Sequence, residues 1–396
     1  MSVVDQDLST AKKFMMGNEA IARGALESGI HFAAGYPGTP SSEIIQFLSE
    51  EAKSLNLHVE WSTNEKVATE GAAAAAFSGL RSLVTMKNAG LSVALDFLTH
   101  LSYTGLGDRG GAMVTVVCDD PNAHSSGDET DSRWLAKFAS APLLEASSVQ
   151  EVREMVKWAF DLSETFKCFV MVRGYTRLCH ASSPIKTGNL PKLQTKAMTD
   201  SSKSITPYLA WPKHAAILEN LEKVRQRFES SSFNAYEGPK TPDLIIICGG
   251  SGSPCSSEAV EVLGLQHKVG IFKLGTLWPF PTEVVREYLI KTDKVLVIEE
   301  VDPFIEIHVK ETLADAHLEG KRVYGKGSGH IPAYGEITPD RVITALSRIL
   351  EVDREPKDPE YERMLSHAAE NLLISRGLTW CAGCPHRASF WALERA

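Results

Sequence analysis

The chain has 396 residues, enough for two or three domains, and its 43% hydrophobic and 23% charged residues are typical of a folded globular protein. The net charge of −9, from 41 basic and 50 acidic side chains, argues against a nucleic-acid-binding surface. No apolar run approaches the ~20 residues that a membrane-spanning helix needs, and the N-terminal residues lack the apolar core of a signal peptide. We therefore expect a cytoplasmic protein that contacts neither nucleic acid nor membrane.

The first elements are a helix and then a strand, a loop and a second helix. Residues 14–29 have the spacing of an amphipathic helix that ends at a glycine. Residues 31–35 carry two aromatic rings without a helical period and predict a short buried strand. Residues 36–40, Tyr-Pro-Gly-Thr-Pro, must form a loop, because two prolines and a glycine interrupt helices and sheets. Ser41 and Ser42 offer N-caps for the helix that follows.

The next residues repeat this plan. Residues 59–63 predict a strand, Asn64 lies at the turn, and Glu65 begins an alanine-rich helix. A carboxylate in the first turn of a helix also suits the helix dipole, so Glu65 alone would not indicate a site. However, two adjacent parallel strands would place Thr39 and Glu65 at the same carboxyl edge, where open α/β sheets bind ligands. The small side chains at 71–76 further indicate that something packs closely against this helix.

A third strand at 81–86 is predicted to end in a turn at 87–90, followed by a helix at 91–101. Lys87 and Asn88 lie in this turn and would therefore reach the same edge of the sheet. Two interpretations of Lys87 remain equally open. It is either a solvated loop charge or a residue at the mouth of a ligand site.

Two polar or glycine-rich segments flank the strand predicted at 112–118. Residues 103–111 contain four glycines and Arg109, and an arginine held among glycines can bind an anion with two parallel hydrogen bonds. Residues 119–133, DDPNAHSSGDETDSR, follow the strand and contain many acidic side chains. They suit a solvated loop, and their spacing fits no known metal site. Strands at 143–146 and 169–173 would complete a doubly wound sheet.

The composition changes after residue 181, where prolines, serines and lysines become frequent. We divide the chain into a first α/β domain at 1–185 and a linker at 186–240. The linker contains a bracing helix at 215–229, which would cross the first domain or a partner subunit. A second α/β domain follows at 241–352, and residues 353–396 form a further linker and the start of a third domain.

The second domain begins with an apolar run at 244–248, which predicts a buried parallel strand. The glycine-rich loop at 249–254 resembles a dinucleotide fingerprint, but Cys255 occupies the third glycine position, so a tight strand-to-helix turn is favoured. Further strands are predicted at 269–274, 294–299 and 322–325. For Glu299 and Glu300, at the end of one of these strands, we favour a structural role.

Several segments together resemble one enzyme family. AGYPGTPSSE and WSTNEKVATEGAAAAAFSG resemble the pyrimidine-binding domain of the thiamine-diphosphate-dependent 2-oxoacid:ferredoxin oxidoreductases. DDPNAHSSGDETDSR resembles a signature of the indolepyruvate-type alpha subunits, and GTLWPFP and VIEEVDP resemble the transketolase C-terminal-like domain of that family. The resemblance implies an α/β protein in which a doubly wound parallel-sheet pyrimidine-binding domain precedes a transketolase C-terminal-like α/β domain.

The resemblance also implies roles for individual residues. A glutamate at the position of Glu65 hydrogen-bonds ring nitrogen N1′ of the cofactor and favours its 4′-imino form, whose nitrogen removes the C2 proton. Thr39 and Arg109 would hold the substrate. The implied cofactor contacts are Tyr36, Pro37, Gly38, Asn64, Glu65, Lys87 and Asn88. A second set on the substrate side is His124, Ser125 and Arg133.

The segment TWCAGCPHR at 379–387 resembles the start of the family's diphosphate-binding domain. Cys381 and Cys384 could be two ligands of a 4Fe–4S cluster, although a lone C-x-x-C is a weak signal because two ligands do not make a site. The family's GDG…N motif for magnesium and diphosphate is not found in the sequence. We therefore expect Mg²⁺, the diphosphate anchor and the iron–sulfur clusters to be held by a partner chain or by further residues.

The function that the resemblance implies is oxidative decarboxylation of arylpyruvates to aryl-acetyl-coenzyme A, with ferredoxin as electron acceptor. This chain would provide the pyrimidine-binding half of the active site, would need a partner subunit, and would work in an oligomer. Two alternatives remain open. The chain could be a non-catalytic assembly subunit, or it could serve an enzyme that uses pyruvate or 2-oxoglutarate.

Overall fold

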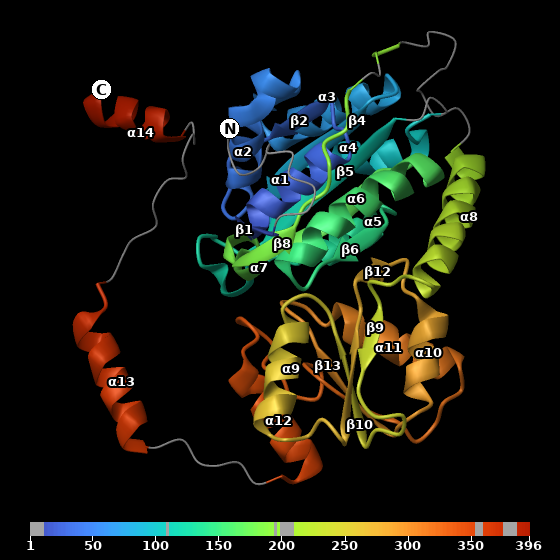
Figure 1. Ribbon diagram of the computed structural model, residues 1–396, viewed down its shortest axis with the longest axis vertical. Helices are drawn as coiled ribbons and strands as arrows, with labels where there is room; N and C mark the ends of the chain where they lie inside the picture. The colour runs from blue at the N-terminus through green and yellow to red at the C-terminus, as the bar shows by residue number, and fades with distance from the viewer. Residues whose placement is uncertain (1–11, 108–110, 194–195, 199–209, 353–358, 375–385) are drawn as a thin grey trace.

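The computed structural model describes residues 12–107, 111–193, 196–198, 210–352, 359–374 and 386–396. Figure 1 shows two α/β bodies stacked along the long axis, which we call the N-terminal body (residues 12–193) and the C-terminal body (residues 235–352). Helices α13 (Pro359–Leu372) and α14 (His386–Arg395) lie away from both bodies (Figure 1). None of the helices in the described ranges has the length and apolar character needed to cross a lipid bilayer.

A seven-stranded sheet forms the centre of the N-terminal body. Across the sheet the strands are β12 (Thr276–Trp278), β6 (Leu143–Glu145), β7 (Val170–Tyr175), β5 (Ala112–Asp119), β4 (Arg81–Lys87), β2 (Phe32–Gly35) and β3 (His58–Trp61). All neighbouring strands from β2 to β7 are parallel. The chain builds the sheet outward from β2 in both directions, which confirms the predicted doubly wound α/β fold.

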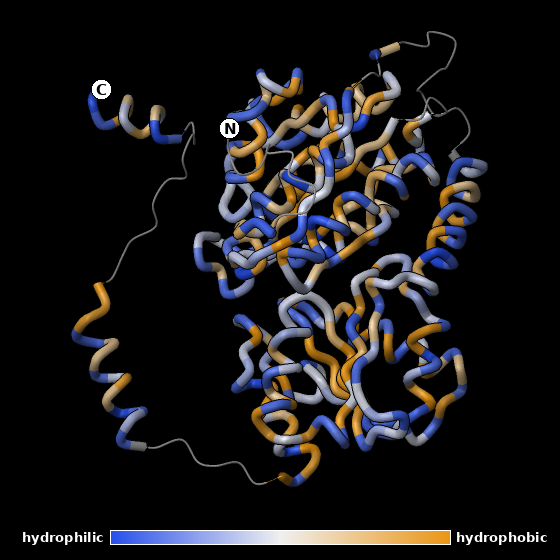
Figure 2. Tube along the Cα trace, in the orientation of Figure 1, coloured by the Kyte–Doolittle hydropathy of each residue, from blue (hydrophilic) through white to orange (hydrophobic). Residues whose placement is uncertain are grey.

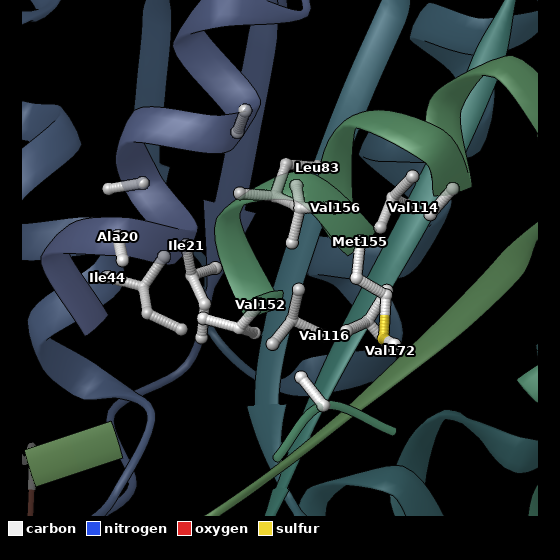
Figure 3. Close-up of a cluster of buried hydrophobic side chains, with 14 of the residues drawn as sticks. Ala20, Ile21, Ile44, Leu83, Val114, Val116, Val152, Met155, Val156 and Val172 are labelled. Carbon is white, nitrogen blue, oxygen red and sulfur yellow. The ribbon is translucent and has the colours of Figure 1, made fainter. Parts of the chain in front are cut away.

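Helices cover both faces of this sheet. They are α1 (Gly17–Glu27), α2 (Ser42–Leu55), α3 (Glu65–Phe77), α4 (Asn88–Thr104), α5 (Ser132–Phe138), α6 (Val149–Phe166) and α7 (Thr176–His180). On one face, Ile21 of α1, Ile44 of α2 and Val156 of α6 pack with Leu83 and Val114 of the sheet (Figure 3). These side chains are fully buried, so the apolar faces of three helices pack into a single core.

The core on the opposite face continues into the C-terminal body. It contains Ala72 of α3 and Leu91 of α4, and it also contains Ile245 and Phe272 of the second sheet. The expected close packing of the alanine-rich helix is present, because the Ser82 hydroxyl donates a 2.7 Å hydrogen bond to the Ala72 carbonyl. Large side chains on α3 would not allow the sheet to approach its backbone so closely.

The C-terminal body contains the second sheet. Its strand order is β14 (Arg322–Tyr324), β13 (Lys294–Ile298), β10 (Leu244–Cys248), β11 (Val269–Lys273) and β9 (Ala235–Glu237). Its helices are α9 (Gly252–Val262), α10 (Thr282–Leu289), α11 (Phe304–Asp315) and α12 (Pro339–Leu350). β10 is buried along its whole length, as its apolar run predicts, and Figure 2 shows hydrophobic residues along the central strands of this body. The glycine-rich loop after β10 is a tight strand-to-helix turn, as predicted.

Helix α8 (Ala210–Glu229) contacts both bodies. Its Asn220 amide donates a 2.8 Å hydrogen bond to the Phe166 carbonyl in the N-terminal body. At the other end, a Glu229 carboxylate oxygen accepts a 2.8 Å hydrogen bond from the Val284 amide in the C-terminal body. The helix predicted at 215–229 begins five residues earlier, at Ala210. Its contact with the first domain was one of the two arrangements expected from the sequence.

Two local predictions were wrong, and one strand was not predicted. Residues Lys12–Met16 form strand β1 rather than the start of a helix, and they pair antiparallel with β8 (Ser182–Lys186). Along β1, Lys13 and Met15 are buried whereas Phe14 is 70% exposed, which is the two-residue period of a strand. In place of the expected turn at 87–90, Lys87 ends β4 and residues 88–90 form the first turn of α4. No strand was predicted at residues 276–278, where β12 pairs antiparallel with β6 of the first sheet.

Candidate active site

Three adjacent strands of the first sheet end at one edge, and the predicted site segments follow them. Gly35 at the end of β2 is in register with Trp61 of β3 on one side and with Thr85 of β4 on the other. The loop at 36–40, the Asn64–Glu65 turn and the junction of β4 and α4 at Lys87–Asn88 therefore lie along the same carboxyl edge. This is the part of a doubly wound sheet that binds ligands.

Asn64 places Glu65 at the start of α3. The Asn64 side-chain oxygen accepts a 2.9 Å hydrogen bond from the Val67 amide and caps the helix. The Glu65 carboxylate is half-buried and reaches the backbone of Gly90 in the first turn of α4. Burial raises the pKa of Glu65 above its ordinary value.

The Glu65 carboxylate has unused hydrogen-bonding capacity. Apart from its own backbone amide, no residue in the described ranges donates a hydrogen bond to it, and it forms no ion pair there. Buried carboxylates in folded proteins are normally hydrogen-bonded or paired with a cation. A half-buried, unpaired carboxylate at a ligand-binding edge is therefore suited to receive a polar group of a ligand.

The loop at 36–40 is fixed by the helices around it. The Gly38 amide donates a 2.8 Å hydrogen bond to the Ser42 hydroxyl, and the Ser41 hydroxyl donates a 2.9 Å hydrogen bond to the Gly38 carbonyl. Ser41 is the residue before α2, but its side chain holds the loop rather than capping the helix. Thr39 is half-buried between these two anchors.

Sequence reasoning missed Asn18, which holds the other end of this loop. Its side-chain amide, buried in α1, donates to the Pro40 carbonyl at 2.7 Å and to a Glu43 carboxylate oxygen at 2.9 Å. Asn18 thus joins the loop to the start of α2. Asn18 is one of three buried polar side chains of α1, with Arg23 and Glu27, so no separate signal in the sequence pointed to it.

Lys87 is held within the protein, so it is not merely a solvated charge. Its ammonium group donates a 2.9 Å hydrogen bond to the Ser125 carbonyl. A Cβ atom built on Gly38 would stand 3.0 Å from the Lys87 Cβ, so the loop passes closely over this side chain. Lys87 therefore connects the loop at 36–40 to the polar segment at 119–133.

The polar segment at 119–133 is folded around Asp120. One Asp120 carboxylate oxygen accepts hydrogen bonds from the Ser125 amide at 2.7 Å and the Ser126 hydroxyl at 2.6 Å, and the other accepts from the Thr176 hydroxyl at 2.7 Å. Burial opposes ionisation, but these hydrogen bonds lower the pKa of Asp120 below its usual range. The buried Asn88 side chain adds 3.2–3.3 Å hydrogen bonds to Asp128 and to the Thr130 carbonyl.

Two of the predicted substrate-side residues contact the C-terminal body. The His124 imidazole lies 3.6 Å from a Glu336 carboxylate oxygen. The Arg133 guanidinium is fully buried, 2.6 Å from Asp131 and 2.7 Å from Glu299, and it also donates to backbone carbonyls of residues 300 and 302. All of these Arg133 contacts are within the protein, so the structure places its charge between the two bodies, away from any open surface.

Three predicted site residues, Arg109, Cys381 and Cys384, lie outside the described residues. Within the described residues, no group of three or more histidine, cysteine, aspartate or glutamate side chains is arranged to hold a metal ion. The edge around Glu65 fits the aminopyrimidine end of thiamine diphosphate, because that ring requires an unpaired, partly desolvated carboxyl group.

Family models match most of both bodies. Residues 23–208 match the thiamine-diphosphate-binding domain of the pyruvate flavodoxin/ferredoxin oxidoreductases. Residues 242–335 match core domain II of pyruvate:ferredoxin oxidoreductase. The two matches follow the same order along the chain as the two sheets.

Curated relatives are similar over the whole chain. Indolepyruvate oxidoreductase subunit IorA of Archaeoglobus fulgidus is 39% identical over 404 residues, which cover 99% of this chain and 62% of the relative. The same subunit of Thermococcus kodakarensis is 39% identical, covering 100% and 61%. 2-Oxoglutarate synthase subunit KorA of Methanothermobacter thermautotrophicus is 25% identical, covering 73% and 88%. The chain thus spans about three fifths of the length of its IorA relatives.

Solved structures share the fold. 2-Oxoglutarate:ferredoxin oxidoreductase from Magnetococcus marinus, with 2-oxoglutarate, coenzyme A and succinyl-coenzyme A bound, has a TM-score of 0.65 at 15% identity, covering 86% of this chain and 65% of that chain. A split-gene transketolase in an inactive beta4 tetramer has a TM-score of 0.55 at 12% identity, covering 86% and 99%. Because the two family models match most of the chain and relatives 39% identical match all or nearly all of it, the chain belongs to the thiamine-diphosphate-dependent 2-oxoacid:ferredoxin oxidoreductase family.

Proposed function

We propose that this chain supplies the pyrimidine-binding half of a thiamine diphosphate site in an oxidoreductase that acts on arylpyruvates. The observation that carries the proposal is the Glu65 carboxylate, which is half-buried and unpaired within the described residues at the carboxyl edge of the sheet. A subunit used only for assembly would gain nothing from the cost of burying such a group. We further propose residues 1–185 as the pyrimidine-binding unit.

The chemistry asked of Glu65 is a proton shared with a ring nitrogen. Desolvation disfavours the carboxylate anion and raises the pKa of Glu65. This reduces the difference in free energy between the proton on the carboxyl group and the proton on the ring nitrogen, so the two groups can share it. When bound here, thiamine diphosphate would supply a nucleophilic carbon and an electron sink for the decarboxylation of a 2-oxo acid. Glu65 contributes by holding N1′ protonated, which requires a fixed carboxyl position.

The substrate side of the site is proposed at the loop at 36–40. Thr39 provides a hydroxyl at the edge, between the Gly38 and Pro40 anchors, and Arg109 provides a positive charge for the substrate carboxylate. Tyr36, Pro37, Gly38, Asn64, Lys87 and Asn88 line or support the cofactor. Ser125 belongs to this side through its contact with Lys87. We assign His124 and Arg133 to positioning of the C-terminal body, because their contacts are made there.

The complete reaction needs groups that this chain is not proposed to hold alone. A 2-oxo acid and coenzyme A would give an acyl-coenzyme A thioester, carbon dioxide and a proton, and two electrons would pass singly to two oxidised ferredoxins. We propose that Mg²⁺, the diphosphate anchor and the 4Fe–4S clusters come from a partner subunit or further residues, with Cys381 and Cys384 as two cluster ligands. The working enzyme would be a cytoplasmic oligomer.

The test is calorimetric binding of thiamine diphosphate with magnesium to the assembled enzyme. Glu65→Gln keeps the size of the side chain but cannot donate a proton as a carboxyl group does, so we expect weaker binding and loss of turnover. Glu70→Gln is the matched control, because Glu70 is exposed on the same helix five residues later. Equal binding and turnover in wild type and Glu65→Gln would favour the assembly-subunit alternative.

Substrate preference needs a separate measurement. The relatives at 39% identity over the whole chain are indolepyruvate oxidoreductase subunits, whereas a 2-oxoglutarate synthase subunit reaches 25% over 73% of the chain. We therefore expect kcat/KM of the assembled enzyme to be higher for indolepyruvate and phenylpyruvate than for pyruvate and 2-oxoglutarate. A preference for pyruvate or 2-oxoglutarate would reject the arylpyruvate assignment and leave the role of Glu65 intact.

A further inference from the structure

Gly90 occupies the space next to the Glu65 carboxylate. It lies in the first turn of α4 and is buried. A Cβ atom built on Gly90 would stand 2.3 Å from Glu65 Oε1, 2.6 Å from Cγ and 2.7 Å from Cδ. Real side chains do not approach one another so closely, so the Glu65 side chain can lie here only because residue 90 has no side chain.

The backbone gives no other reason for a glycine at this position. Gly90 is not among the residues with positive φ, so its conformation is open to any amino acid. Glycine inside a helix is about 0.8–1.0 kcal/mol less favourable than alanine. The helix therefore carries a glycine at a cost in stability, and the space that it leaves is occupied by Glu65.

The surrounding backbone cannot easily move to admit a methyl group. The Ser82 hydroxyl joins β4 to the Ala72 carbonyl of α3 at 2.7 Å, and β4 runs directly into α4. Ala68 of α3 and Leu91 and Ala94 of α4 are fully buried in one apolar core. Because α3 and α4 are held by this packed core and by the Ser82 hydrogen bond, a side chain at position 90 would displace the Glu65 side chain rather than the helices.

We propose that Gly90 is a positioning residue for Glu65, and that the absence of a side chain at position 90 fixes where the carboxyl group is presented to the ligand. This inference rests on the proposed function of Glu65 for its catalytic consequence, whereas the contact itself does not depend on it. A glycine with a purely structural role would be replaced at a cost to folding. For Gly90, replacement by alanine should instead leave folding intact and lower the activity.

The experiment compares stability, the state of Glu65 and activity in Gly90→Ala. We expect the melting temperature of the chain to be unchanged or higher, since alanine favours the helix. Without any cofactor, a carbon-13 NMR titration should show the raised pKa of Glu65 returning toward its ordinary value, because the displaced carboxyl group gains water. In the assembled enzyme, turnover should fall by about 100-fold, the lower end of what a positioned acid–base group contributes.

Two further variants isolate the contact. Ser92→Ala also favours α4, but at an exposed position away from Glu65, so it should leave the titration and turnover unchanged. In the Glu65→Gln background, Gly90→Ala should cause no further loss of turnover, since both changes would act through one side chain. An additional loss of tenfold or more would overturn the proposal.

The two proposals can fail separately. An unchanged Glu65 titration and full turnover in Gly90→Ala would overturn the positioning role. Full turnover in Glu65→Gln would overturn the proposed function. If the pKa of Glu65 nevertheless returns toward its ordinary value in Gly90→Ala, the contact between the two residues would be retained. If Gly90→Ala does not fold, the shorter side chain in Glu65→Asp/Gly90→Ala should restore folding by clearing the methyl group. Failure of that double variant to fold would show that the clash is elsewhere and would also overturn the proposal.

Discussion

Arg133 of the N-terminal body donates a 2.7 Å hydrogen bond to Glu299 of the C-terminal body, and both side chains are buried. Asp131 binds the same guanidinium at 2.6 Å, so one arginine neutralises carboxylates from both bodies. The apolar core beside them is also shared, since Ile245 and Leu91 belong to one cluster. The two bodies are thus joined by a contact that is both apolar and ionic, and the segment at 119–133 provides its ionic part.

Removing the charge of Arg133 should destabilise the chain strongly. Arg133→Leu leaves Asp131 and Glu299 as buried, unpaired carboxylates, and loss of one partner of a buried pair costs about 3–5 kcal/mol. The free energy of unfolding in urea measures this loss. Arg286→Leu is the control, because the Arg286–Glu283 pair is about half exposed and should contribute less than about 1 kcal/mol. Equal effects of the two variants would contradict the structural role of Arg133.

The same interface should make stability depend on pH between about 4 and 7. Burial raises the pKa of Glu299 to about 7, and it raises the pKa of Asp119, which pairs with Arg173 inside the N-terminal body, to about 6. Because these values exceed the unfolded values of about 4, the folded state holds protons that the unfolded state has released, so this contribution is lost as pH rises. The melting temperature of the wild type should be lower at pH 7.5 than at pH 5, and the difference should be smaller in Glu299→Gln. An identical pH dependence in both would show that Glu299 does not titrate in this range.

Asn18 should hold the loop at 36–40 in position without contacting the ligand itself. Asn18→Ala removes the hydrogen bonds to the Pro40 carbonyl and Glu43 and leaves a buried carbonyl unsatisfied, a loss of about 1–3 kcal/mol. In the assembled enzyme we expect KM for the 2-oxo acid to rise more than kcat falls, since the loop is proposed to contact substrate. Ser49→Ala, an exposed change on α2, should leave both constants unchanged. A fall in kcat without a change in KM would contradict this assignment.

The sequence patterns predicted the parts of the fold that are determined by residues close together in the sequence. The apolar run at Leu244–Cys248 and the polar turn before Glu65 carry strong local signals, and both elements lie where expected. β12 could not be predicted, because nothing in Thr276–Trp278 indicates pairing with Leu143 far away in the sequence. The closeness of Gly90 and Glu65 is equally non-local, since it depends on how α3 and α4 pack across β4.

Asp120 should determine whether the polar segment at 119–133 remains ordered over the site edge. Asp120→Asn preserves the shape but replaces one accepting oxygen with a donor, so it cannot accept from Ser125, Ser126 and Thr176 together. We expect faster amide hydrogen exchange across residues 122–130, with the strands of the sheet still protected. The Ser125 carbonyl would then no longer hold Lys87, so KM for the 2-oxo acid should also rise. Unchanged exchange in this segment would show that its fold depends instead on the Asn88 and Arg133 contacts.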